Sequence, residues 1–460
     1  MPRRGTAVRR EGIRAASAEA NRRILLVCSV LAAGCPSSSK SPPAADAGPA
    51  LDAGLSDAGP GDGGPTDAGV PDAGPADAGV PTTTGQFTRL TEGPPLPPPD
   101  EVIREGNGLP DSFIDAQHDA AGNMWAVSPS HLYVRRAGLI AWESFNTSNG
   151  LFGEQILSVG GGIANTAWVG YHGEGDGDAT DPPSWWYTGG TDKVVLSGAN
   201  ITVTHYALVS PPGTYPQYPD GRFKLRRTLR VYPTKTGRFA GDAWFGCNHG
   251  GAQVAADGEV LEHHHPLLCV WDPSINACAT THEGDVPAIG FYANGNVLFG
   301  GTYGLGSLKY SDEPGGDFWG DEPIHNFQIF ANPIDSNGYG SQDVDGVGAA
   351  SDGSVWAVSE HTGLAHLHID GKTVDVFQEA QGLPSNDITD LAIDSNDNAW
   401  IATTNNGLVR LNLHTGVWQQ ANGLPSSTTQ RVMFEKTNTL SYVTVIVSGA
   451  IGVYVIPTGP

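Results

Sequence analysis

Basic residues are scarce in this sequence of 460 residues. It has 25 Lys and Arg against 49 Asp and Glu, a formal net charge of -24 at pH 7. Without residues 1–34, which hold seven arginines and two glutamates, 18 basic and 47 acidic residues remain, and the net charge is about -29. Such a charge repels polyanions, so it excludes nucleic acid as a partner and disfavours adsorption to anionic lipid headgroups.

Long apolar runs are also missing. The run from Ile24 to Ala33 is about ten residues long, too short to span a bilayer. It follows the arginines and precedes Gly34, and this order predicts a secretory signal over residues 1–34. The ending Ala-Ala-Gly-Cys resembles the lipobox of bacterial lipoproteins. The resemblance implies cleavage before Cys35, acylation of its thiol and a membrane contact through the lipid; with Pro36 next, it implies the outer membrane.

Common catalytic motifs are absent as well. The sequence has no Gly-x-Ser-x-Gly elbow, no Gly-x-x-x-x-Gly-Lys-Ser/Thr phosphate loop, and no Gly-x-Gly-x-x-Gly after a predicted strand. This disfavours the enzymes that depend on those motifs. It leaves open an enzyme that gathers its residues from separate repeats.

Large apolar side chains are almost missing from residues 41–83, where Asp-Ala-Gly occurs six times among prolines. A segment with so little to bury cannot offset the entropy cost of ordering. Its seven aspartates repel one another and extend the chain. Residues 35–86 are therefore predicted to be a disordered tether.

A repeat is present beyond the tether, and its clearest copy runs from Gly382 to Pro425. Apolar alternation predicts strands over 388–393, 400–403, 408–413 and 417–420, and Asn- and Gly-rich turns separate them. The run Asp394 to Asn398 looks like the start of a calcium loop, but its twelfth position is Asn405, so a hairpin turn is predicted.

One central residue marks each copy of the repeat. The spacing is about 43 residues near both ends of the series and longer in its middle, which is typical of propeller blades. We therefore predict an all-β fold with a single β-propeller of about seven four-stranded blades over 87–460 and a long insert at about 171–240. The strand at 101–104 is predicted to complete the last blade and close the ring. The seven markers are Trp125, Trp168, Trp244, Leu298, Trp356, Trp400 and Val443.

The copies resemble the two-component-regulator type of propeller repeat. That repeat combines a Gly-Leu-Pro turn, an Asp-x-x-Gly-x-Trp-Ile-Gly-Thr strand and a Gly-Leu-x-Arg strand. Residues 382–424 match it well, and 107–150 and 346–368 match it in part. The resemblance implies the propeller fold and is almost silent on function.

Histidine is densest between residues 249 and 265. Strand alternation would place His263 and His265 on one face, and His249 on a neighbouring strand could complete a divalent metal site. Cys247 is a softer candidate ligand beside them. The alternative is a polar turn with ordinary hydrogen bonds, because fixed zinc spacings are absent.

Two other features suggest sites outside the repeated strand pattern. Cys269 and Cys278 flank a predicted turn and could form a disulfide in an oxidising compartment; the alternative is buried free thiols. The loop from 173 to 190 either presents aromatics to a partner or uses them to cap its own blade. Its aromatic residues are Trp185, Trp186 and Tyr187.

The one basic cluster surrounds Arg230 in the stretch FKLRRTLRVY, and its alternation predicts a solvated strand face; the alternative is an anion site. Two function classes remain. The first is an exported, lipid-anchored sensor or scaffold module that binds a protein, a glycan or a small ligand. The second is a metal-dependent propeller hydrolase or lyase.

Overall fold

The computed structural model describes residues 84–457 except 105, 107–108, 110–111, 154, 175–187, 210–226, 249, 264–267, 273–276, 283–284, 302–303, 312–317, 323–343 and 372. Within 262–284 and 309–343 only the backbone of the strands is described. In the described part of the chain, no helix is long and apolar enough to cross a membrane.

Seven antiparallel sheets of four strands form the blades, which confirms the predicted all-β propeller. Blade 1 is β3 (Asp115–His118), β4 (Met124–Val127), β5 (Leu132–Arg135) and β6 (Trp142–Phe145). Blade 2 is β7 (Ile156–Gly161), β8 (Thr166–Tyr171), β9 (Thr191–Ser197) and β10 (Asn200–Tyr206). Blade 3 is β11 (Thr228–Pro233), β12 (Ala243–Cys247), β13 (Gly250–Val254) and β14 (Val260–His263). Blade 4 is β17 (Ala288–Phe291), β18 (Val297–Gly301), β19 (Gly304–Ser311) and β20 (Phe318–Glu322).

The last three blades complete the ring. Blade 5 is β21 (Gly346–Ala349), β22 (Val355–Ser359), β23 (Gly363–Leu367) and β24 (Val374–Phe377). Blade 6 is β25 (Ile388–Ile393), β26 (Asn398–Thr403), β27 (Leu408–Asn412) and β28 (Val417–Gln420). Blade 7 is β29 (Thr429–Lys436), β30 (Ser441–Val447), β31 (Ala450–Ile456) and β2 (Glu101–Ile103). A separate hairpin, β15 (Leu268–Asp272) and β16 (Ala277–His282), lies between blades 3 and 4 in sequence.

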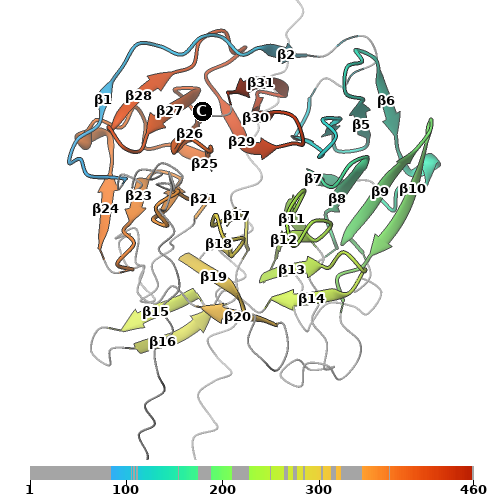
Figure 1. Cartoon of the computed structure of the whole chain (residues 1–460), viewed down its shortest axis with the longest axis horizontal. Coiled ribbons are helices and arrows are strands. Elements are labelled where there is room, and N and C mark those ends of the chain that lie inside the picture. The colour runs from blue at the N-terminus through green and yellow to red at the C-terminus, as the bar shows by residue number, and fades with distance from the viewer. Residues whose placement is uncertain are drawn as a thin grey trace, which may run out of the picture. The chain divides into compact units, whose positions relative to one another are not determined.

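The ring closes where the sequence predicted. Strand β2 pairs antiparallel with β31, with Val102 opposite Gly452 and Ile103 opposite Ile451. Figure 1 shows the blue N-terminal strands beside the red C-terminal ones. A further strand, β1 (Thr91–Glu92), pairs parallel with the outer strand β28 of blade 6 and was not predicted.

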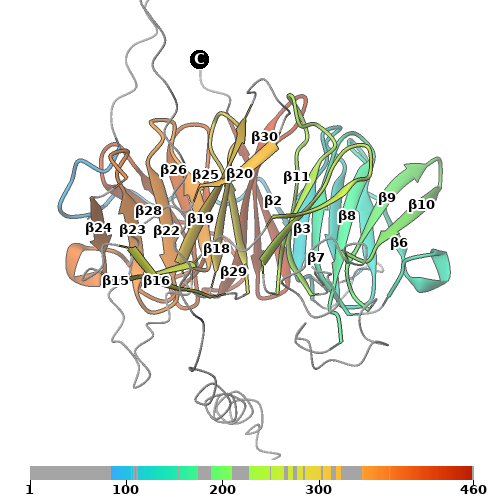
Figure 2. The ribbon, with the colours of Figure 1, turned by 90° about the horizontal axis from the view of Figure 1, so that it is seen from below.

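The first strands are innermost, and each contacts the first strand of the next blade around the ring. Because each blade is a simple up-and-down sheet, the turns between its first and second strands all gather on one face, named here the first-turn face. The connections between blades gather on the opposite face. Figure 2 shows the strands of neighbouring blades standing between these two sets of turns.

The Gly-Leu turns have a definite structural role. The short 3-10 helix Glu379–Gln381 ends at Gly382, whose φ of 93° is left-handed and suits glycine. The leucine that follows, Leu383, is 4% exposed and packs in the core between blades 5 and 6. Gly150 and Leu151 repeat this arrangement after blade 1.

Six of the seven marker residues occupy the same place in the second strand and pack toward the next blade. The seventh assignment was one residue wrong, because Val443 packs back toward Trp400 of blade 6. Thr444, opposite Met433, holds the equivalent position. Every residue from Val443 to Val447 is β-branched, so polar and apolar residues do not alternate there. The sequence therefore does not indicate which side chains face which side of the strand.

Candidate functional site

A layer of seven residues, four of them charged, surrounds the central channel. Each first strand contributes one residue to this layer. In every blade it is the residue that pairs with the position two residues after the marker position of the second strand. In blade order these residues are Asp115, Ser158, Arg230, Ala288, Gly346, Asp390 and Arg431.

Arg230 of blade 3 forms an ion pair and hydrogen bond with Asp390 of blade 6. The two side chains are 4% and 1% exposed. Since blades 3 and 6 are not neighbours, the pair spans the channel. The predicted solvated face for Arg230 was therefore wrong: a first strand faces the channel, so its polar position is buried, although on an outer strand the same residue pattern would be solvated.

Arg431 completes the charged layer. Its guanidinium donates to the Leu229 carbonyl at 3.2 Å and lies 3.5 Å from the carboxylate of Asp115. Burial raises the pKa of Asp115, and the two arginines only partly oppose this. Burial also lowers the pKa of Arg431, to which the charge of Arg230 adds. Two acids and two bases thus neutralise one another inside the channel.

A cavity of about 420 Å³ lies on the first-turn side of this layer. Its walls are the ends of β17, β21 and β25 and the turns that follow them, with Tyr232 and Phe434 reaching in from blades 3 and 7. Two residues further along these first strands, blades 4, 5 and 6 carry Gly290, Gly348 and Ala392, which line the cavity. Strand β21 packs so closely there that a Cβ on Gly290 would lie 2.5 Å from the Val347 carbonyl oxygen. The same position in blades 1, 3 and 7 holds Gln117, Tyr232 and Met433, and Gly160 of blade 2 is covered by Pro233.

The turn of blade 6 makes one wall of the cavity rigid. Asp394 accepts hydrogen bonds from the backbone of Asn396 and Asn398 and from the indole of Trp400 at 2.8 Å, which confirms the predicted hairpin turn. Asp397 accepts the Ser351 backbone N–H at 2.8 Å and so fastens the turn of blade 5 to that of blade 6.

The remaining cavity surface is largely aromatic and aliphatic. Phe291 packs edge-on against Tyr232 at 6.1 Å between ring centroids. Burial raises the pKa of Tyr232 to about 12, so its phenol stays protonated at neutral pH and can donate a hydrogen bond. The cavity can therefore receive a compact group with an apolar surface and an acceptor atom.

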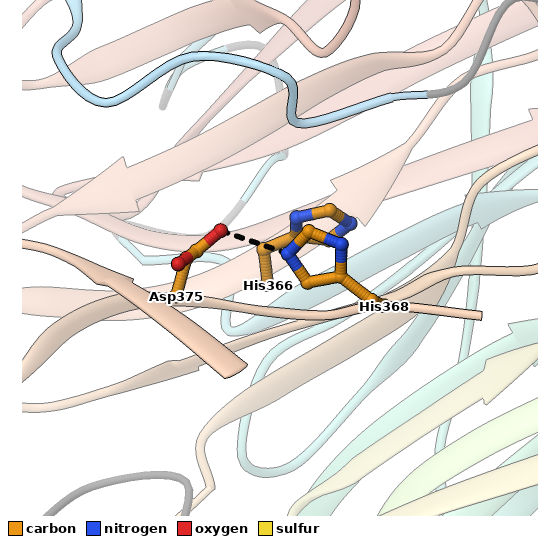
Figure 3. Close-up of side chains that lie close together, drawn as sticks. All are labelled: His366, His368 and Asp375. Atoms are coloured by element: carbon orange, nitrogen blue, oxygen red, sulfur yellow. Dashed lines mark hydrogen bonds and ion pairs between the residues drawn. The ribbon is translucent and has the colours of Figure 1, made fainter. Parts of the chain in front are cut away.

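A second cluster lies on the outer strands of blade 5, where two imidazoles and a carboxylate come together (Figure 3). His366 lies directly opposite Asp375 in the β23–β24 pairing, and His368 follows two residues after His366. The side chain of His368 is within 2.8 Å of Asp375, measured from Nε2 to Oδ2. One ligand atom from each of the three residues lies within 4.8 Å of the others.

His366 has an unusual environment. It is 1% exposed, and neither ring nitrogen has a hydrogen-bond partner among the described residues. Burial lowers its pKa to about 4, and the neighbouring His368 adds to this. The ring stacks on Trp356 at 4.1 Å.

Trp356 differs from the equivalent indoles of blades 1 and 6. Those donate to Asp119 and Asp394, whereas blade 5 carries Ala350 at that position. Within the described structure the Trp356 N–H has no partner. Blade 5 thus stacks two buried, unsatisfied aromatic rings against each other.

This cluster was not predicted from the sequence, although the residue pattern indicates it. His-Leu-His on a strand places both imidazoles on one face, and a short hairpin returns Asp375 to the same face. The metal ligands that the sequence predicted are different residues. His249 and His265 are outside the described residues, and of His263 only the backbone, opposite Gly251, is described.

The other predicted site residues mostly fall outside the description. This holds for Cys35 and for the aromatic group Trp185, Trp186 and Tyr187. The hairpin between Cys269 and Cys278 is present, with Cys269 opposite Thr281 and Cys278 opposite Trp271, but the cysteine side chains are not described.

Cys247, the softer candidate ligand, packs in the apolar core between blades 2 and 3. Burial raises the pKa of its thiol, which its hydrogen bond with Thr228 only partly opposes. A thiol that resists deprotonation in this way is a poor metal ligand.

Comparison with known proteins agrees with the repeat. The family model described as two component regulator propeller matches residues 382–405, from the Gly-Leu-Pro turn into the second strand of blade 6. No curated protein matches the chain. Among solved structures, YCF48 bound to D1 peptide is 15% identical and covers 80% of this chain and 99% of its own, with a TM-score of 0.48. YCF48 from Cyanidioschyzon merolae is 13% identical over 75% of this chain and 95% of its own, with a TM-score of 0.45.

Proposed function

We propose that this propeller-repeat protein is an exported binding module, held at a membrane by acyl chains on Cys35, which takes a compact uncharged group into the mouth of its channel. The observation that carries the proposal is the cavity of about 420 Å³ formed where three successive blades have Gly, Gly and Ala. Its volume falls in the range of small-molecule sites.

The shape of the cavity supports binding without rearrangement. Its walls are strands of three blades and the turns that follow them. Asp394 braces the turn of blade 6 from within, and Asp397 fastens that turn to the turn of blade 5. A preformed site avoids part of the entropy cost of ordering a loop on binding.

The polarity of the cavity supports an uncharged ligand. The two arginines of the channel layer, Arg230 and Arg431, already pair with Asp390 and Asp115. The acidic side chains of the cavity are occupied as hydrogen-bond acceptors within the turns. A charged ligand would lose its water shell without a free partner charge. An apolar group with one acceptor can pack on Phe291 and accept from the phenol of Tyr232.

The described residues favour binding over the metal-dependent hydrolase or lyase. The three metal-type ligands that come together lie on the third and fourth strands of blade 5 and not on the first strands around the channel. They therefore supply no Lewis acid to the cavity.

The proposal can be tested with Nile red, a neutral apolar dye whose emission changes on leaving water. The wild-type chain should bind it at one saturable site. Ala293→Trp places a large side chain at the cavity rim and should weaken binding at least about tenfold, or about 1.4 kcal/mol. Ala349→Phe fills the cavity from the wall of blade 5 and should act in the same way.

The matched control is Ala137→Trp. Ala137 is also an exposed alanine in a turn, but it borders a separate hollow between blades 7 and 1. Its variant should bind the dye like wild type. Equal affinity in all four proteins, or no saturable binding to wild type, would refute a ligand site at the channel mouth.

A further inference from the structure

The three polar side chains of blade 5 have the composition of a transition-metal site. Two imidazoles and one carboxylate are donors that zinc, cobalt and nickel accept, whereas calcium and magnesium favour oxygen ligands alone. His366 lies in β23, and His368 follows the last residue of that strand and donates its backbone N–H to the Thr373 carbonyl at 3.0 Å. Asp375 is held by direct pairing with His366. The backbone therefore fixes the spacing of the ligands before any ion binds.

The buried imidazole gives an independent reason for a ligand at this place. A polar side chain that is 1% exposed and has no hydrogen-bond partner in the described structure carries the full cost of desolvation. His366 is such a group, and its unpaired nitrogens lie beside His368 and Asp375. A metal ion at this point would satisfy one of them.

We propose that His366, His368 and Asp375 form a binding site for one divalent transition-metal ion of the zinc class. Two ligand atoms at about 2.0–2.2 Å from one ion lie at most about 4.4 Å apart. The three ligand atoms already lie within 4.8 Å of one another, so binding requires at most a small side-chain movement. His368 and Asp375 can make this movement because their side chains are 31% and 47% exposed.

Three protein ligands leave one position of a tetrahedral ion open. His366 forms the floor of the site, and the two partly exposed ligands lie on its solvent side. The open position therefore faces water, and a water molecule or a donor atom of a partner can occupy it. This distinguishes the site from a closed structural zinc site with four protein ligands.

The first described residues of the chain cover the buried side of the cluster. Gly85 packs so closely on His366 that a Cβ there would lie 2.1 Å from the Nδ1 atom. Thr84 donates from its backbone N–H to Asp352 at 2.7 Å, which holds this segment on blade 5. An ion would thus join two outer strands of blade 5 under the point where the N-terminal segment meets the ring.

The site is tested by metal content. Full-length chain prepared without a histidine tag is stripped with chelator, incubated with Zn²⁺, dialysed and analysed by elemental mass spectrometry. The sequence has 14 histidines, including the run at 263–265, so the readout is the difference between variants. His368→Ala and Asp375→Ala should each bind one zinc ion fewer per chain than wild type. Both alter partly exposed side chains and so spare the folded core.

The matched control is His361→Ala. His361 also lies against an aspartate, Asp387, at 2.7 Å, and it is exposed. Glu360 contacts its other ring nitrogen at 3.5 Å, so the two carboxylates lie on different nitrogens, and among the described residues these three do not gather their ligand atoms at one point. This variant should bind as many zinc ions as wild type. An equal loss in the control and in His368→Ala would show adventitious surface binding and overturn the site.

Asp375→Cys provides a positive test that a merely structural role would not pass. If residue 375 is a ligand, this variant loaded with Co²⁺ should show a sulfur-to-cobalt charge-transfer band in the near ultraviolet. Adding His368→Ala to it should weaken Co²⁺ binding at least tenfold. Absence of the band, or a zinc content of Asp375→Ala equal to that of wild type, would overturn the proposal.

Discussion

Breaking the ion pair between Arg230 and Asp390 should lower the stability of the ring more than breaking an exposed ion pair. Asp390→Ala removes the only carboxylate that Arg230 is seen to pair with in the described structure and leaves a guanidinium that is 4% exposed. It also removes the acceptor of the Val432 backbone N–H, which lies 3.0 Å from the carboxylate. The charged layer would then hold two arginines against Asp115 alone.

The expected loss is large because a buried charge without a partner cannot be resolvated. Removing one member of a buried pair costs about 3–5 kcal/mol. At about 2.1 cal/mol/K per residue, the roughly 370 residues of the ring have an unfolding entropy of about 0.8 kcal/mol/K. The melting temperature should therefore fall by about 4–6 °C.

Three further variants separate charge from hydrogen bonding. Asp390→Asn keeps an acceptor for Val432 but not the charge, so it should lose most of the same stability. Arg230→Met with Asp390→Leu removes both charges and should recover most of the loss. Glu101→Gln is the control, because Glu101 pairs with Arg135 but is 41% exposed, and it should cost less than about 1 kcal/mol.

Differential scanning calorimetry at neutral pH measures all of these shifts. The reasoning would be refuted if Asp390→Ala melted within about 1 °C of wild type. It would also be refuted if the double variant melted no higher than the single one.

Two further predictions concern the tether and the pH dependence of stability. Cys35→Ala should abolish acylation and release the protein from membranes, and mass spectrometry showing an unmodified mature N-terminus in the wild type would contradict this. Burial opposes the ionisation of Glu435, but Lys235 and His118 outweigh it and hold its pKa below the ordinary 4.5. Its contribution to stability is therefore present above about pH 4.5 and lost as the pH falls further, so the gap in melting temperature between wild type and Glu435→Gln should shrink below pH 4.5; a gap that stays constant down to pH 3 would contradict this.

The fold could be predicted from the sequence because each propeller blade is formed by strands that are close together in the chain. The hydrophobic alternation of residues 388–420 lies within one blade, so pairing partners are close in sequence, and the predicted strands agree with β25 to β28 to within a few residues. Ring closure was predictable for a similar reason, since the last blade lacks its fourth strand and 101–103 supplies one. Where alternation was missing, as around Val443, the reading was one residue out of phase.

The candidate sites were harder to predict because their residues are far apart in the sequence. The Arg230–Asp390 pair joins positions 160 residues apart, and nothing in the local pattern of either indicates the other. The cavity is lined by small residues that recur in three successive blades, and only the closed ring brings those blades around one space. The His-Leu-His pattern of His366 and His368 could have indicated a metal site. The prediction instead used the histidines around the run at 263–265, because histidine is denser there.

By itself the sequence determined the number of blades, the order of their strands and the way the ring closes, because these follow from short-range periodicity and turn chemistry. The tertiary structure alone decided which polar residues are buried and which of them meet. Arg230 lies in a pattern that suits a solvated strand, yet its strand is the first of its blade and faces the channel. The ring brings it to Asp390, and that contact exists only after all seven blades have closed around one axis.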